Sequence, residues 1–145
     1  IDDFTDHHPI TDDSKARLRP KYRKYSGVIV DLYYDHFLAR NFNQYSEIPL
    51  PEFTQRTYAI LLDNQSVLPD QVKEFLPFMI ERNWLNNYST IEGIGRTLTG
   101  LSKRVSFENK MDESVHDLQT DYAIYKNEFH RFFPQLITFA DGKKM

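Results

Sequence analysis

Apolar residues recur at helical spacing along most of this chain, and this periodicity is the feature that most limits its possible folds. In the C-terminal third they step alternately by four and three residues, at Leu118, Tyr122, Tyr125, Phe129, Phe132 and Leu136. That spacing places them on one face of an α-helix. We find no convincing alternation of apolar and polar residues, the pattern typical of a half-buried strand. The sequence therefore predicts an all-α fold.

One predicted helix combines unusual length with high apolar content. It covers residues 21–40 and is entered through Pro20. Its apolar side chains lie on most of its sides rather than along one stripe. A helix of this kind is normally buried, so we expect it at the centre of the fold.

Prolines and capping residues mark the other helices. Pro49 and Pro51 mark a loop before a helix that ends near residue 62, and Pro69 opens the next helix. Ser89 and Glu92 have the spacing of a capping box, which begins a further helix. The apolar stripe of that helix is formed by Ile91, Ile94, Leu98 and Leu101. We expect these elements to pack as one helical bundle that spans residues 1–145.

The composition excludes several classes of protein. With 145 residues, 40% of them hydrophobic, the chain can bury the core of one domain. It has no cysteine, so disulfides and thiolate zinc sites are excluded. A net charge of −3 gives no general attraction to nucleic acid, and the apolar runs are far shorter than the roughly 20 residues that span a membrane. We expect a cytoplasmic protein that binds neither, and we read the start at Ile1 as a fragment or processed form.

Acidic residues in apolar surroundings are the first candidates for a functional site. Asp31 and Asp35 lie four residues apart on one face of the expected central helix, and His36 follows directly. Like charges at this spacing repel by about 0.2–0.5 kcal/mol even in water, and their burial costs more unless a cation lies between them. Asp2 and Asp6 repeat the spacing. Carboxylates with an imidazole suit Mn²⁺, Mg²⁺ or Fe²⁺, and such an ion favours hydrolysis of a phosphoester.

Simpler interpretations of the same residues stay open. Asp2, Asp3 and Asp6 could be carboxylates at the start of a helix, where the helix dipole stabilises them. Asp35 and His36 could face water or cap a neighbouring helix.

A basic run lies between residues 15 and 24. Its cations are Lys15, Arg17, Arg19, Lys21, Arg23 and Lys24. Such a run is most often a solvated helix face, but it could also attract an acidic partner. No RNA-binding motif accompanies it. Arg40, Arg96 and Arg104 are further candidates for holding phosphate, because a guanidinium group matches phosphate oxygens.

Five stretches, in one order along nearly the whole chain, carry a family resemblance. They are Ile1-Asp2 with Thr5-Asp6 and Pro9, Tyr34-Asp35-His36-Phe37-Leu38-Ala39-Arg40, Trp84-Leu85 with Tyr88, Gly100-Leu101-Ser102 with Arg104, and Phe132-Phe133-Pro134. Together they resemble the acyl carrier protein phosphodiesterases, also called holo-acyl-carrier-protein hydrolases. That family is similar to the all-helical HD-type metal-dependent phosphohydrolases. Its members cut the phosphodiester that joins 4′-phosphopantetheine to a serine of holo acyl carrier protein, usually with Mn²⁺, and leave apo carrier protein. The resemblance thus implies a role in fatty acid biosynthesis.

The resemblance implies a metal site and catalytic residues. Asp2, Asp6, Asp35 and His36 match metal-site residues. Asp31 would not bind the metal directly but would orient His36 or a bound water that does. We therefore expect Asp35, His36 and Asp31 to carry the catalysis.

The resemblance also covers phosphate and partner binding. Arg40 and Arg104 match arginine positions, and we expect both to contact phosphate. The basic run suits an acidic acyl carrier protein. Family members carry several dozen further residues before the position of Ile1, including a His-Arg pair, and we expect a ligand and part of the core to come from that segment.

Two rival functions fit the same residues. An HD-type phosphohydrolase of nucleotides or other small phosphoesters would act without a carrier protein. A non-catalytic helical module that binds an acidic partner through residues 15–24 would keep its function after Asp35→Ala.

Overall fold

The computed structural model describes residues 2–81, 83–105 and 108–143, and within these ranges the chain forms helices and turns but no strand. The α-helices are α1 (Asp2–His7), α2 (Pro9–Tyr22), α3 (Ser26–Arg40), α4 (Leu50–Asp63), α5 (Asp70–Glu81), α6 (Trp84–Asn87), α7 (Ile91–Arg104), α8 (Ser114–Thr120) and α9 (Tyr122–Lys143). Short 3₁₀ turns lie at η1 (Arg23–Tyr25), η2 (Phe42–Gln44), η3 (Gln65–Val67) and η4 (Met111–Glu113). The predicted all-α, single-domain fold is confirmed.

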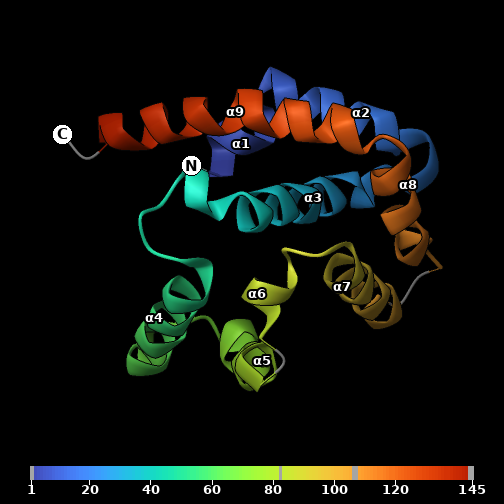
Figure 1. Cartoon of the computed structure of the whole chain (residues 1–145). Helices are drawn as coiled ribbons and strands as arrows, with labels where there is room; N and C mark the ends of the chain where they lie inside the picture. Colours follow the sequence, from blue (N-terminus) through green and yellow to red (C-terminus); the bar gives the residue numbers. More distant parts are fainter. Residues whose placement is uncertain (1, 82, 106–107, 144–145) are drawn as a thin grey trace.

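The helices are arranged on two sides of α3 (Figure 1). On one side α2 and α9 run next to each other, and both contact α3. On the other side α7 packs against α3. Helices α4, α5 and α6 lie on this same side, toward the C-terminal end of α3. Ile29, Tyr33 and Phe37 of α3 are fully buried. The expected central position of this segment is therefore confirmed.

The expected single helix over residues 21–40 is wrong. Helix α2 continues through Pro20 to Tyr22, and α3 begins only at Ser26. Leu18 and Tyr22 are each 3% exposed, so burial of this face holds α2 helical beyond the proline. The chain then turns at Arg23, which has a φ of 50° and donates its N–H to the carbonyl of Arg19.

The remaining helix boundaries follow the sequence closely, with two shifts. The expected cap Ser89 donates its hydroxyl to the carbonyl of Asn86 (2.8 Å), and it is Thr90 that caps α7 by accepting from the N–H of Gly93 (2.9 Å). The C-terminal stripe is split between α8 and α9, which meet at Asp121. No described helix combines the length and the apolar content needed to cross a membrane.

We expect Gly93→Ala to destabilise the fold by about 1–3 kcal/mol. A Cβ atom at position 93 would lie 1.8 Å from the backbone oxygen of Asn87, so the connection between α6 and α7 would have to shift. Gly100→Ala in the same helix is the control, because no atom lies within 4 Å of its Cβ position and alanine favours a helix by about 1 kcal/mol. Urea unfolding measures both variants, and equal losses would contradict the expectation.

Candidate active site

The acidic pair of α3 lies on the face of that helix that remains open to solvent. Asp31 and Asp35 are both exposed, whereas Leu32, Tyr34 and His36 next to them are buried. Asp35 keeps contact with solvent but is surrounded by protein on most sides. This enclosure, together with the charge of Asp31, raises the pKa of Asp35 to about 7.

Tyr88, in the connection between α6 and α7, lies close to this pair. Burial, followed by the charge of Asp35, raises the pKa of the Tyr88 hydroxyl to about 12. Its backbone carbonyl lies 2.8 Å from Nδ1 of His36. Tyr88 is therefore hydrogen-bonded to His36 through its backbone carbonyl, while its side chain is affected by the charge of Asp35.

His36 is fully buried, and both of its ring nitrogens have partners. Nδ1 pairs with the carbonyl of Tyr88, and Nε2 lies 2.8 Å from the hydroxyl of Tyr122, the first residue of α9. Burial lowers the pKa of His36, the hydrogen bond to Tyr88 opposes this, and the charge of Arg40 lowers it further. The ring is therefore neutral near pH 7.

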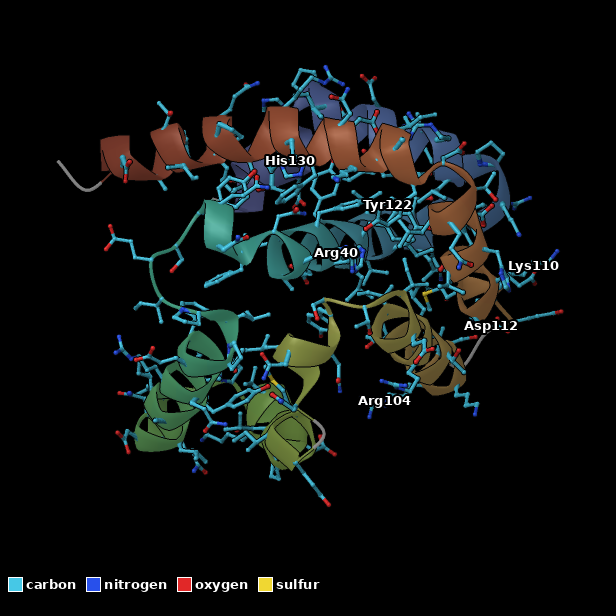
Figure 2. The ribbon with its side chains drawn as sticks, viewed as in Figure 1. Arg40, Arg104, Lys110, Asp112, Tyr122 and His130 are labelled. Atoms are coloured by element: carbon cyan, nitrogen blue, oxygen red, sulfur yellow. The ribbon has the colours of Figure 1, made fainter. Side chains whose placement is uncertain are left out.

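Arg40 is the last residue of α3, and Figure 2 labels it below Tyr122, the first residue of α9. Burial raises the pKa of the Tyr122 hydroxyl, and the positive charge of Arg40 lowers it. The guanidinium of Arg40 therefore influences the hydroxyl that is hydrogen-bonded to His36. Arg40 also lines a groove between the first turn of α4 and the residues that precede α7, among them Ser89 and Thr90. Its Nη1 lies 3.5 Å from the carbonyl of Ser89.

Arg104 does not share this groove. It lies at the C-terminus of α7 and lines a second groove, between α7 and the η4–α8 segment, together with Arg96, Lys103 and His116. Figure 2 shows Arg104 and Arg40 on different helices, α7 and α3. The two predicted phosphate contacts therefore belong to separate places in the fold.

The expected metal-site residues are only partly brought together. Asp6 belongs to α1, which packs on α2, and its backbone oxygen accepts from Lys15 Nζ at 3.0 Å. Asp2 is helical, but its side chain lies outside the described part of the structure. Among the side chains that are described, no three His, Asp or Glu residues gather in a way that could hold a metal. The assignment of Asp2, Asp6, Asp35 and His36 as metal-site residues stays a prediction.

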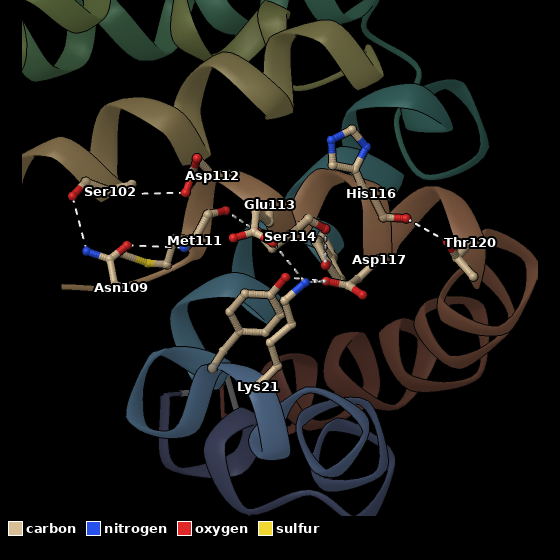
Figure 3. Close-up of polar contacts among 12 residues, drawn as sticks. Lys21, Ser102, Asn109, Met111, Asp112, Glu113, Ser114, His116, Asp117 and Thr120 are labelled. Atoms are coloured by element: carbon tan, nitrogen blue, oxygen red, sulfur yellow. Dashed lines mark hydrogen bonds and ion pairs between the residues drawn. The ribbon is translucent and has the colours of Figure 1, made fainter.

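Several cations of the basic run are engaged within the fold. Arg17 forms two hydrogen bonds of 2.9 Å with the carboxylate of Glu128, which is 4% exposed. Lys21 lies between Glu113 (3.4 Å) and Asp117 (3.6 Å), as Figure 3 shows. Tyr22 also donates its hydroxyl to Asp117. Arg17 and Lys21 thus help to hold α2 against α8 and α9.

The other cations of the run face outward. Arg19, Arg23 and Lys24 are exposed. Arg23 and Lys24 line a groove at η1 that also includes Lys110. Some cations of the basic run therefore stabilise the packing of α2, and the others remain exposed on the surface.

Sequence reasoning missed two partners of the candidate site, Tyr88 and Tyr122. Tyr122 fits the apolar stripe of the last helix and was expected only as a core residue. The signal that could have identified it is its hydroxyl, since a buried tyrosine normally needs a hydrogen-bond partner. The carbonyl of Tyr88 carries no sequence signal at all.

Comparison with known proteins identifies the relatives of this chain. The family model described as "Acyl carrier protein phosphodiesterase" matches residues 1–136. A protein of that name from Enterobacter sp. (strain 638) is 30% identical over 149 residues, which cover 100% of this chain and 76% of the relative. Namesakes from Klebsiella pneumoniae (strain 342) and Escherichia coli O157:H7 are 28% and 27% identical, with the same coverage. No solved structure matches, so the HD-like relationship stays a prediction.

Proposed function

Because this chain belongs to the acyl carrier protein phosphodiesterase family, we propose that it hydrolyses the phosphodiester between 4′-phosphopantetheine and a serine of holo acyl carrier protein with the help of a divalent metal. Water adds to phosphorus, the bond from phosphorus to the serine oxygen breaks, and that oxygen takes up a proton. The products are apo carrier protein and free 4′-phosphopantetheine. The observation that carries the proposal is the acidic pair Asp31–Asp35 on the solvent-facing side of α3, next to the buried His36.

The donor chemistry of this site suits a divalent cation such as Mn²⁺. Asp31 and Asp35 supply carboxylate oxygens on the solvent-facing side of α3. Burial, followed by the charge of Asp31, raises the pKa of Asp35, and a bound cation would oppose both effects. His36 is a further ligand that the family resemblance implies, and its Nε2 is hydrogen-bonded to the hydroxyl of Tyr122 in this structure. A bound divalent ion would lower the pKa of a water molecule and stabilise charge on the phosphate.

The phosphate is proposed to bind at Arg40. The guanidinium can direct two N–H groups at phosphoryl oxygens and stabilise the charge that develops there. Its groove is bordered by the first residues of α4, Leu50 and Pro51, and by the cap of α7, Thr90. The N-termini of α4 and α7 border this groove with their positive dipole ends, while α3 ends there with its negative one.

The carrier protein is proposed to dock on the exposed half of the basic run. Arg19, Arg23 and Lys24 are the members that face outward, and Lys110 extends this surface across the groove at η1. An acidic partner would be attracted to this surface and would associate more slowly at high ionic strength.

The test is conversion of holo to apo carrier protein. The purified chain is incubated with holo carrier protein and Mn²⁺, and mass spectrometry follows the loss of the phosphopantetheine group. We expect apo protein to accumulate and to stop accumulating in excess chelator. Absence of apo product, together with turnover of free nucleotides, would replace the proposal by a small-phosphoester hydrolase. Absence of both would favour a non-catalytic binding module.

A further inference from the structure

A side-chain amide on the wall of the Arg40 groove has a buried oxygen atom without a partner. The amide belongs to Asn86 of α6, which lines the same groove as Arg40. Its Oδ1 is closed off from solvent, and among the described residues this atom has no hydrogen-bond partner. An unpaired buried acceptor is costly, and nearly all buried polar atoms of native proteins have a partner. The groove is therefore a place where a donor from a ligand would be favoured.

The connection between α6 and α7 holds Asn86 close to Arg40. The backbone carbonyl of Asn86 accepts from the hydroxyl of Ser89 at 2.8 Å and from its N–H at 3.2 Å. The carbonyl of Ser89 in turn lies 3.5 Å from Nη1 of Arg40. The side chain of Asn86 is partly exposed, and the terminal torsion of an asparagine is broad. Its amide oxygen can therefore turn toward the groove without any movement of the backbone.

The lining of the groove suits a ligand with an anionic head and an amide-containing chain. Its volume is about 710 Å³, within the range of small-molecule sites, about 300–1,000 Å³. Arg40 supplies a cation, and Ala39, Leu50 and Pro51 supply an apolar wall. A phosphodiester group has no hydrogen to donate to the oxygen of Asn86. The pantetheine chain next to it carries a hydroxyl and amide N–H groups that can donate, and methyl groups that suit the apolar wall.

A second groove also reaches Arg40. It has a volume of about 460 Å³, includes Phe42 and Glu47, and shares Ala39, Arg40 and Leu50 with the first groove. A phosphate held at Arg40 thus has open space on two sides, as a diester with two organic arms requires. Among the described residues that line the second groove, no buried side-chain oxygen or nitrogen lacks a partner. The amide-containing arm therefore fits the first groove better.

We propose that Asn86 determines specificity for the pantetheine arm: its amide oxygen accepts a hydrogen bond from that chain while Arg40 holds the phosphate. The inference rests on the proposed function and adds to it the groove that takes this arm of the diester. Binding gives the buried acceptor the partner that it lacks in the free protein. Asn86 contacts the chain and not the phosphorus, so its loss should weaken recognition of pantetheine and spare recognition of phosphate.

The first test is isothermal titration calorimetry of the chain with free 4′-phosphopantetheine and, separately, with inorganic phosphate. The wild type should bind 4′-phosphopantetheine more tightly. Asn86→Leu keeps the size of the side chain without its polar atoms, and it should weaken that binding about fivefold, the factor equivalent to one ordinary hydrogen bond, while phosphate binding stays the same. Asn127→Leu, an exposed position of α9, is the matched control and should change neither affinity.

Three results would overturn the inference. They are unchanged affinity of Asn86→Leu for 4′-phosphopantetheine, an equal loss of affinity for both ligands, and no binding of 4′-phosphopantetheine by the wild type.

A second measurement uses only the wild type and so does not depend on folding of the variant. In ¹⁵N NMR, the side-chain amide resonances of Asn86 should shift on addition of 4′-phosphopantetheine and stay in place with inorganic phosphate. Bound 4′-phosphopantetheine with unshifted Asn86 resonances would also overturn the inference. Neither measurement needs carrier protein or turnover. Binding through Asn86 without formation of apo carrier protein would contradict the proposed hydrolysis alone, whereas hydrolysis with unchanged affinity of Asn86→Leu would contradict this inference alone.

Discussion

Replacing Asp35 by asparagine is expected to lower phosphodiesterase turnover by about 10²–10⁴-fold while the chain stays folded. The amide keeps the size of the side chain but removes the charge that the proposed cation would bind. Asp35 is in contact with solvent, so the substitution disturbs no packed core. Conversion of holo to apo carrier protein in the presence of Mn²⁺, followed by mass spectrometry, measures the effect.

The stability of the metal-free protein separates lost chemistry from a lost fold. The pKa of Asp35 is about 7 in the native state, against an ordinary value of 3.8. Between these values the native state binds the proton more tightly than the unfolded chain does, so rising pH lowers stability until the native pKa has been passed. Asparagine cannot ionise. Asp35→Asn should therefore equal the wild type near pH 4 and exceed its stability at pH 8, in urea unfolding with chelator present.

A matched control is Asp63→Asn, a change of the same kind at the exposed end of α4. It should alter neither turnover nor the pH dependence of stability. Full turnover by Asp35→Asn would mean that the acidic pair of α3 is not the site. A turnover loss accompanied by a stability loss at pH 8 would mean that the carboxylate supports the fold instead.

Helical periodicity predicted most of the helices and much of the core, because burial of one face is a local property of the sequence. Ile94 and Leu98 of α7 and Phe129 of α9 are buried as their spacing indicates. Periodicity failed at Pro20, where tertiary burial of Leu18 and Tyr22 outweighs the local preference of proline for a helix start. Local sequence signals favour one helix boundary over another, but tertiary packing can reverse that preference.

The candidate site shows a sharper limit. The sequence singled out Asp31, Asp35 and His36 because charges in an apolar stretch conflict with burial. It could not indicate the partners of His36, since Tyr88 and Tyr122 lie 52 and 86 positions away along the chain. Spacing shows which residues share a face of one helix, but it does not show which other helix packs on that face.

The same limit applies to the basic run, and Arg17→Ala tests it. A charge run is usually a solvated face, but Glu128, 111 positions from Arg17, is nearly buried and accepts both guanidinium hydrogen bonds. Removal of Arg17 leaves that carboxylate buried without its cation, and among the described residues the hydroxyl of Ser14 is its one remaining donor (2.8 Å). We expect a loss of about 3 kcal/mol in urea unfolding at pH 7. Arg19→Ala, an exposed neighbour in α2, should change stability by less than about 0.5 kcal/mol.

The pair can be tested further by a double-mutant cycle. Glu128→Ala should cost less than Arg17→Ala, because the Arg17 side chain is 29% exposed and can turn to water, whereas the Glu128 side chain is 5% exposed. The double variant should cost less than the sum of the two single losses, since it leaves no unpaired charge. Additive losses would contradict a coupled pair. Strong coupling would mean that Arg17 serves the contact between α2 and α9, so that an acidic carrier protein must dock through other cations of the run.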